Sequence, residues 1–309
     1  MAQITAKQVA DLRAKTGCGL MECKKALVEA EGDFDAAVKI LREKGLATAA
    51  KKADRVAAEG VVDIMRSDDG KVAAMIEVNA ETDFVAKNDT FLQFVKGLLR
   101  TILSLRPSTL EELKASKFDG GESTVDETLV QMIATIKENI SIRRFLVAEG
   151  QLNTYIHGHG QTGVIVQFDT DDETAAGEAF AEMSKNVALQ VAAMNCQYVD
   201  IPAVPASVIK EETEINSVKI KNDPKNASKP DAIIAKMAEG MLKKFYTLVC
   251  LSEQAYVKEE SMTVGKYVES VAKQVGKPIK LVQFYRFEKG EGIQKREDNF
   301  AEEIASLVK

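Results

Sequence analysis

The feature that most constrains the fold of this chain is an internal repeat with a spacing of ninety residues. An Ala-Glu-Gly triplet, a turn glycine and a short apolar run recur in the same order without a gap. The matching positions are 58–60 and 148–150, Gly70 and Gly160, and 74–76 and 164–166. Because each copy continues into an acidic turn and an amphipathic helix, the repeat predicts two related α+β subdomains with antiparallel sheets.

The first copy begins with a predicted β-hairpin. Val61 to Arg66 and Val72 to Val78 have the character of strands, and residues 67–70 supply a Gly-containing turn between them. After the acidic turn, Thr90 stands as the predicted N-cap of an amphipathic helix. The apolar positions of this helix recur at helical spacing and are Phe91, Phe94, Val95, Leu98 and Ile102.

Phe84 lies in the acidic turn between strand and helix, flanked by Asp83 and Lys87. Its side chain either folds back into the core or is offered to a partner. At the same spacing the second copy has Asp172-Glu-Thr174, which contains no aromatic residue. A side chain that only sealed the core would be expected to stay apolar in both copies. The comparison therefore favours a contact role and leaves both alternatives open.

The first 45 residues predict three short helices. The first helix begins at a capping box, the second follows a Gly-Cys-Gly turn, and the third begins after Asp33 and stops at Gly45. Their predicted ranges are 5–16, 20–30 and 34–45. A bundle of this size has no room for a deep catalytic cleft, so it is typical of a binding module. The Ala- and Lys-rich segment that follows is expected to be a partly helical tether.

Two further elements are predicted between the copies. Ser108 to Glu111 form a capping box, and an apolar stripe at helical spacing then indicates a core helix. The stripe consists of Leu129, Met132, Ile133 and Ile136. The apolar segment 141–147 predicts a strand that enters the second copy.

The second copy is interrupted by a predicted helical hairpin. Helices of roughly 206–221 and 231–245 flank a polar turn that contains two prolines. Their apolar residues form only a narrow seam between charged faces, which suits a projecting antiparallel coiled coil. The predicted seam consists of Val208, Ile209, Ile215, Ile233, Ile234 and Met237.

The chain then returns through 249–251 and a β-rich segment, 279–287. A final predicted helix carries Phe300, Ile304 and Val308 on one face, and this face needs cover from the core or from a partner. The expected division of the chain begins with a three-helix domain (1–45), a linker (46–59) and a first core subdomain (60–140). A second core subdomain follows in two parts (141–204 and 246–288), which are separated by the inserted hairpin (205–245). A C-terminal module (289–309) completes the chain.

Charge and composition exclude several classes of protein. The net charge of −6 argues against a broad basic face for nucleic acid. No run reaches the ~20 apolar residues of a membrane span, and the first five residues resemble no signal or transit peptide, so a cytoplasmic location is expected. The cysteines are expected to be reduced packing residues because none has the spacing of a zinc site, with Cys18 in an exposed turn. They stand at positions 18, 23, 196 and 250.

The residues indicate no enzyme. Gly290-Glu-Gly292 lacks the Gly-Lys-Ser/Thr ending of a phosphate loop. His157 and His159 are chemically suited to act as a base or a ligand, but no nucleophile motif lies near them. A histidine in a hairpin turn is more often a solvated structural residue. No cofactor and no metal is therefore expected.

Three motifs in order carry a resemblance to a known family. They are Leu12 to Leu27, Thr82-Asp-Phe-Val-Ala-Lys-Asn88, and Arg286-Phe-Glu-Lys-Gly-Glu-Gly-Ile293. Together they closely resemble the bacterial translation elongation factor Ts family over essentially the full length. The resemblance implies a ubiquitin-associated-like N-terminal domain of three helices, two related core subdomains, a coiled-coil hairpin and a C-terminal module.

The resemblance also implies a function and a site. Members exchange guanine nucleotide on the GTPase elongation factor Tu and have no nucleotide site of their own. The turn of Thr82, Asp83, Phe84 and Val85 would insert into the GTPase near its magnesium and phosphates. The final helix would add a grip, and a homodimer in the complex is left open. Other implied contact residues are Arg13, Thr16, Gly17, Cys18, Met21, Lys87, Asn88 and His157.

Some positions depart from the family pattern. Cys18 and Leu20 stand where Ala and Met are usual, Met241 stands where Arg is usual, and Thr162 alters a familiar turn near His157. The contact at His157 is the one that these departures weaken.

Two rival hypotheses belong to other classes of protein. One is an adaptor that binds one partner through the small bundle and another through the hairpin, and the other is an enzyme whose turnover depends on His157.

Overall fold

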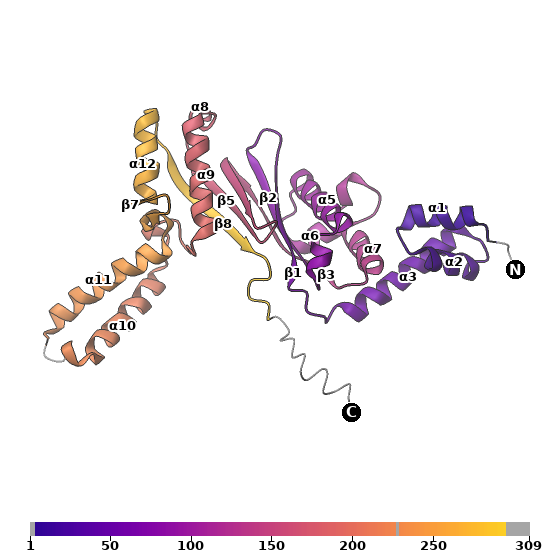
Figure 1. The fold of residues 1–309 in the computed structure, drawn as a ribbon, viewed down its shortest axis with the longest axis horizontal. Coiled ribbons are helices and arrows are strands. Elements are labelled where there is room, and N and C mark those ends of the chain that lie inside the picture. Colours follow the sequence, from indigo (N-terminus) through magenta and orange to yellow (C-terminus); the bar gives the residue numbers. More distant parts are fainter. Residues whose placement is uncertain (1–3, 227–228, 295–309) are drawn as a thin grey trace.

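The computed structural model describes residues 4–226 and 229–294. Three helices at the N-terminal end lead into a core of two three-stranded sheets, and a helical hairpin projects from the far end of the core (Figure 1). The α+β class predicted from the repeat is confirmed. Across the described ranges, no helix is both long enough and apolar enough to cross a membrane.

The N-terminal helices enclose a small apolar core. They are α1 (Ala6–Thr16), α2 (Leu20–Glu29) and α3 (Phe34–Lys52). Thr5 caps α1 in the predicted capping box with Gln8, and Asp33 caps α3. The side chains of α1, α2 and α3 meet at Leu12, Cys23, Ala26, Leu27 and Ala37, none of which exposes any surface.

The prediction that the third helix stops at Gly45 is wrong, because α3 continues to Lys52. Gly45 is buried where α3 crosses α7 (Val125–Ile136). A Cβ atom at this position would lie 3.4 Å from Val130 Cγ1 and 3.6 Å from the Ala134 Cβ. The glycine therefore allows two helices to approach closely. The first half of the expected tether is a continuous extension of α3.

The first sheet has the order β1-β2-β3, and all its pairings are antiparallel. Its strands are β1 (Glu59–Arg66), β2 (Val72–Ala80) and β3 (Ile140–Glu149). The predicted hairpin is confirmed as β1 and β2. The strand predicted at 141–147 is confirmed as β3. Its predicted place in the second copy is wrong, because β3 pairs with β2 and completes the first sheet. The chain changes sheets only at Gly150, whose φ of 118° makes a sharp corner.

Four helices cover the first sheet. They are α4 (Asp83–Ala86), α5 (Asp89–Leu105), α6 (Leu110–Ala115) and α7. All five predicted apolar positions of α5 are buried, as are Leu129, Met132 and Ile133 of α7. Two predicted caps are displaced. Asn88, instead of Thr90, accepts the first amides of α5, and Thr109, instead of Ser108, accepts the Glu112 amide.

The second sheet has the order β4-β5-β8. Its strands are β4 (Gln151–His157), β5 (Thr162–Asp169) and β8 (Lys280–Glu288). The helices of this half are α8 (Asp172–Ala175), α9 (Glu178–Ala193) and α12 (Val264–Val275), and a small hairpin joins β6 (Ala255–Tyr256) to β7 (Glu259–Thr263). Short 3₁₀ turns lie at Phe118–Gly120, Ile201–Ala203, Pro224–Asn226 and Leu251–Glu253.

The repeat is visible in the backbone of the two sheets. Gly60 and Gly150 share an unusual conformation, with φ of 122° and 118°. A β-bulge in β3 lies opposite Glu77 and Val78 of β2. A bulge in β8 lies opposite Gln167 and Phe168 of β5, again ninety residues later. The sheets also pack against each other through Val62, Met75, Leu152 and Ile165. At this contact a Cβ on Gly163 would lie 2.5 Å from Val62 Cγ1, so only glycine fits.

The hairpin consists of α10 (Ala206–Asn222) and α11 (Asp231–Val249). Its distal seam is formed by Ile220, Ile234 and Ala238. Two predicted seam residues, Ile215 and Ile233, are instead 51% and 47% exposed, because Asn216 and Ile234 hold the inward positions beside them. The predicted final helix with Phe300, Ile304 and Val308 lies outside the described residues.

Candidate partner-binding site

The turn that follows β2 is a single helical turn, α4, held firmly at its start. The Thr82 hydroxyl accepts a hydrogen bond from the Val85 amide at 3.4 Å and so caps the turn. The same threonine donates from its amide and its hydroxyl to the two Glu138 oxygens, at 3.0 and 2.7 Å. Glu138 lies in the connection between α7 and β3, so the start of the turn is tied to the segment that enters β3, the strand paired with β2.

Phe84 points away from the core. Its neighbours Val85 and Ala86 are each only 8% exposed, whereas Phe84 is 81% exposed. The alternative that this side chain folds back into the core is therefore wrong. The physical reason is the helical turn itself, since one face of it already fills the core with Val85 and Ala86. An open cleft beside Phe84 is lined by Asn88, Thr90, Thr135 and Ile136.

The acidic residue of the turn is paired within the chain. Lys87 donates to the Asp83 carboxylate at 2.6 Å, an i,i+4 pair on the surface of α4. The hydrogen bond from Lys87 holds the pKa of Asp83 below its usual range. Both side chains are largely exposed, so a partner can replace either half of the pair. Asn88 has a structural task, because it caps α5.

The structure shifts the alignment of the two copies by one residue at this turn. Thr82 caps α4 and Asp171 caps α8, so Phe84 corresponds to Glu173 instead of Thr174. From Glu77 to the cap Thr82 the chain advances five residues, whereas from the matching Gln167 to the cap Asp171 it advances four. Glu173 is exposed like Phe84, and Thr174 is buried like Val85. The second copy therefore presents a carboxylate where the first presents an aromatic ring.

The predicted N-terminal contact residues fall into two groups. Arg13, Gly17 and Met21 are exposed, Met21 to 60%. Thr16 and Cys18 are only 7% and 6% exposed, so the prediction of an exposed Cys18 is wrong. The Thr16 hydroxyl turns inward and donates to the Leu12 carbonyl at 2.7 Å.

Leu20 is a surface residue that the sequence reasoning left out of the site. It is 51% exposed and precedes the exposed Met21 at the start of α2. The sequence held no clear signal for this, because adjacent apolar residues of one helix are often both buried, as Leu98 and Leu99 of α5 are.

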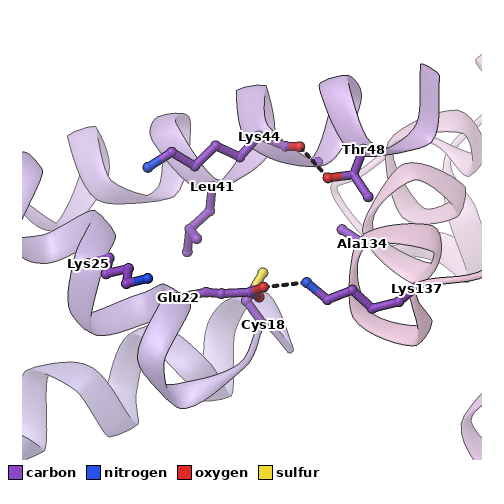
Figure 2. A pocket seen from close by; sticks show the side chains of 9 residues that line it. Cys18, Glu22, Lys25, Leu41, Lys44, Thr48, Ala134 and Lys137 are labelled. Carbon is purple, nitrogen blue, oxygen red and sulfur yellow. Dashed lines mark hydrogen bonds and ion pairs between the residues drawn. The ribbon is translucent and has the colours of Figure 1, made fainter. Parts of the chain in front are cut away.

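A small pocket lies between the N-terminal helices and α7 (Figure 2). Its volume is about 100 Å³, and Glu22 reaches across it to form an ion pair with Lys137 of the core. The hydrogen bond from Lys137 holds the pKa of Glu22 below its usual range, and burial raises the pKa of the Cys18 thiol on the same wall. The pocket is too small for a nucleotide. It marks the seam along which the N-terminal unit packs on the core.

His157 lies at the exposed end of β4, in the second sheet. Its Nδ1 atom is 3.1 Å from the Tyr155 hydroxyl. The predicted contact residues thus occupy three places, namely the α1–α2 region, the α4 turn and the end of β4. Among the described residues, no group of three or more His, Cys, Asp or Glu side chains is placed to hold a metal ion.

The cysteines behave as packing residues. All four are buried free thiols. Burial raises the pKa values of Cys196 and Cys250 to about 11, so both remain protonated at neutral pH. This agrees with the expectation of reduced packing residues.

Comparison with known proteins decides the family. The sequence model described as Elongation factor TS matches residues 81–291, more than half of the chain. Elongation factor Ts of Clostridioides difficile is 48% identical over 311 residues that cover 100% of both chains. The proteins of the same name from Syntrophotalea carbinolica and Clostridium kluyveri are 46% identical, over 313 and 309 residues. These alignments cover 99% of this chain and 100% and 99% of the relatives. The chain belongs to the elongation factor Ts family.

Family membership confirms the resemblance carried by the three motifs. It places the chain among the elongation factors of protein biosynthesis, a family associated with nucleotide exchange on elongation factor Tu. The match begins at residue 81, immediately before the α4 turn, and ends in the loop after β8.

Proposed function

We propose that this chain is a guanine nucleotide exchange factor that releases GDP from elongation factor Tu by inserting the α4 turn near the magnesium and phosphates. One observation carries the proposal. Phe84 is 81% exposed on a turn whose other apolar side chains are buried and whose cap is anchored by Glu138. A rigid turn that offers a bare aromatic ring is suited to enter a partner, because little conformational entropy remains to be lost on binding.

Reciprocity between binding partners supplies the thermodynamic basis. If the chain binds the GTPase more tightly when nucleotide and magnesium are absent, it must weaken both ligands by the same coupling free energy. Faster release also requires an intermediate that holds all components at once. In that intermediate the turn disturbs the metal site before the nucleotide leaves.

Two side chains of the turn have different tasks in this mechanism. Full burial of the Phe84 ring would contribute about 1.5–3 kcal/mol, which is available to displace groups of the GTPase. Asp83 would exchange its Lys87 partner for groups around the magnesium and phosphates, or for the N-terminus of a helix. No covalent bond is made or broken, so the proposal includes no enzyme chemistry and no cofactor of this chain.

The remaining contacts hold the partner while the turn acts. Arg13, Leu20 and Met21 offer an exposed surface in the N-terminal unit, and His157 offers a separate contact on the second sheet. We place Thr16 and Cys18 behind this surface as supports, because their side chains are buried. A cytoplasmic location, where translation takes place, belongs to the same proposal.

Stopped-flow release of a fluorescent GDP analogue from the GTPase tests the proposal. Phe84→Ala is expected to lower the maximal release rate at least tenfold and to change the half-saturating concentration less than threefold. Glu173→Ala is the matched control, because Glu173 is the exposed counterpart in the second copy, and it should release GDP like the unaltered chain. If Phe84→Ala weakens binding to the GTPase but leaves the maximal release rate unchanged, Phe84 does not act as a wedge that displaces groups of the GTPase. If the unaltered chain leaves GDP release unchanged, the adaptor hypothesis is favoured instead.

A further inference from the structure

Glu77 is a fully buried carboxylate in the middle of β2. This strand leads to the α4 turn, which we call the exchange turn. Glu77 lies opposite the bulge in β3, five residues before Thr82, and none of its surface is exposed. Arg143 donates to one of its oxygens at 2.8 Å, and Arg144 donates to the other at 2.6 Å. A buried carboxylate is costly unless it is paired and hydrogen-bonded, and both conditions are met here.

A further donor to Glu77 comes from the far end of the chain. The Gly290 amide, in the loop after β8, donates to the same oxygen as Arg143 at 2.8 Å. Gly290 has a φ of 70°, and a Cβ atom on it would lie 2.4 Å from the Ala58 carbonyl oxygen. No side chain fits at this position. The glycine of the Gly290-Glu-Gly292 motif thus allows the loop backbone to reach the buried carboxylate.

The two arginines extend this contact along the loop. Arg144 donates to the Glu291 carboxylate at 3.0 Å and to the Glu288 carbonyl at 3.2 Å, and its guanidinium lies 4.2 Å from the centre of the Phe287 ring. Arg143 donates to the Glu291 carbonyl. We call Glu77, Arg143, Arg144, Gly290 and Glu291 the clasp.

The loop is also fixed on its other side. The Lys289 amide donates to the Gln161 carbonyl of the β4–β5 turn at 2.9 Å, and its ammonium pairs with Glu59 of β1. The clasp and these two bonds join the last strand of the second sheet to the first sheet. Burial alone would raise the pKa of Glu77, but hydrogen bonds from Gly290, Arg143 and Arg144 outweigh it and hold the pKa below its usual range.

We propose that the clasp is a positioning device for the exchange turn, with Glu77 as its central positioning residue. The inference rests on the proposed function and adds the residues that make the turn effective. Binding energy from contacts far from the turn can act on the nucleotide site of the GTPase only if the intervening structure of this chain is rigid. The clasp makes β2, which carries the turn, continuous with the sheet that carries His157. Partner contacts on both sheets then hold the Phe84 ring in one place.

GDP release by clasp variants provides the test. Glu77→Gln removes the charge with little change in shape, and Gly290→Ala drives a methyl group into the Ala58 carbonyl and displaces the loop. Each is expected to lower the maximal release rate about tenfold and to change the half-saturating concentration less than threefold. Glu288→Gln is the matched control. Its carboxylate pairs with Arg286 at the end of β8, next to the loop, but does not belong to the clasp, so the release rate of this variant should equal that of the unaltered chain.

A second measurement separates positioning from a purely structural role. In a double variant with Phe84→Ala, the clasp substitution should lower the rate less than twofold further, because both changes act on the same step. Circular dichroism verifies that each variant is folded at the assay temperature, and Gly290→Ala carries the test if Glu77→Gln does not fold. Folded clasp variants with a maximal rate within twofold of the unaltered chain would overturn the proposal, as would effects that multiply with Phe84→Ala. Failure of the unaltered chain to release GDP would instead overturn the proposed function.

Discussion

The two copies of the repeat share a backbone and differ in what they present to the outside. The turn after β2 and the turn after β5 are both single helical turns with a capped first residue. Their inward positions are similar, since Val85 and Thr174 are both buried. Their outward positions are Phe84 in the first copy and Glu173 in the second. In both copies the inward residue packs in the core and the outward residue does not, so core packing does not account for the aromatic ring.

A neighbouring residue makes the second turn an internal contact. Asp172 of α8 accepts from Lys71 at 2.7 Å and from Gln151 at 2.6 Å, so it links its turn to the β1–β2 loop of the first copy. Within residues 4–226 and 229–294, Asp83 of the first turn makes no such cross-copy pair, and its partner Lys87 lies beside it on the same turn. One copy therefore uses its turn to join the subdomains, and the other leaves its turn available to a partner.

The largest expected effect comes from giving the first copy the residue of the second. Phe84→Glu should lower the maximal rate of GDP release about 100-fold, because it replaces an apolar wedge with a charge that must be desolvated. Its stability should change by less than about 0.5 kcal/mol, since the side chain is exposed. The release assay measures the first quantity, and thermal unfolding measures the second. The reciprocal Glu173→Phe should retain full activity, and a gain or loss there would mean that the copies are not specialised.

Much of the fold follows from periodicity in the sequence. The helical spacing from Phe91 to Ile102 and the hairpin around residues 67–70 were predicted and are confirmed. The partner of β3 was not predictable in this way, because an apolar strand does not reveal which edge it joins. Gly45 was misread for a similar reason. A glycine looks the same in sequence whether it ends a helix or admits a neighbouring one.

The candidate site was only partly accessible from the sequence. The residues alone left Phe84 between core and contact, and its exposure needed the geometry of α4 to settle. The clasp was not found at all, because Glu77 and Gly290 are 213 residues apart. No local pattern indicates that a strand carboxylate and a loop amide will meet. In the sequence, Gly290 was weighed only against the pattern of a phosphate loop, which says nothing of its contact with Glu77.

The bulge positions of the two sheets give the second comparison. Glu77 is held by two arginines and an amide, whereas the matching Gln167 is neutral and donates to the Glu149 carbonyl at 2.8 Å. Glu77→Ala should lower the free energy of unfolding by about 3–5 kcal/mol, because it leaves the partly buried Arg143 without a carboxylate and Arg144 with the more exposed Glu291 alone. Gln167→Ala should cost about 1 kcal/mol, the value of an ordinary hydrogen bond. Urea denaturation measures both, and equal losses would contradict the comparison.

The pH dependence of stability provides an independent test of the comparison between Glu77 and Gln167. Because the folded pKa of Glu77 is below its usual value of 4.5, its stabilising contribution is complete above that pH and is lost as the pH falls through the folded pKa. The stability difference between the unaltered chain and Glu77→Gln should therefore be constant near neutral pH and shrink in acid. Gln167→Ala should show a difference that does not change with pH. A Glu77→Gln difference that grows in acid would show the opposite sign of the shift.

The smallest expected effect concerns the cross-copy pair of Lys71 and Asp172. The two side chains are 49% and 72% exposed, so solvent and salt screen their attraction. Asp172→Asn should lower the free energy of unfolding by less than about 1 kcal/mol, and the loss should disappear at about 1 M salt, where the Debye length is only about 3 Å. GDP release should stay unchanged, because the clasp and the shared core of Val62, Met75 and Ile165 still join the sheets. Denaturation at low and high salt measures the first effect, and the release assay measures the second. A slower release with unchanged stability would mean that α8 also takes part in exchange, and the two turns would then differ less than their sequences indicate.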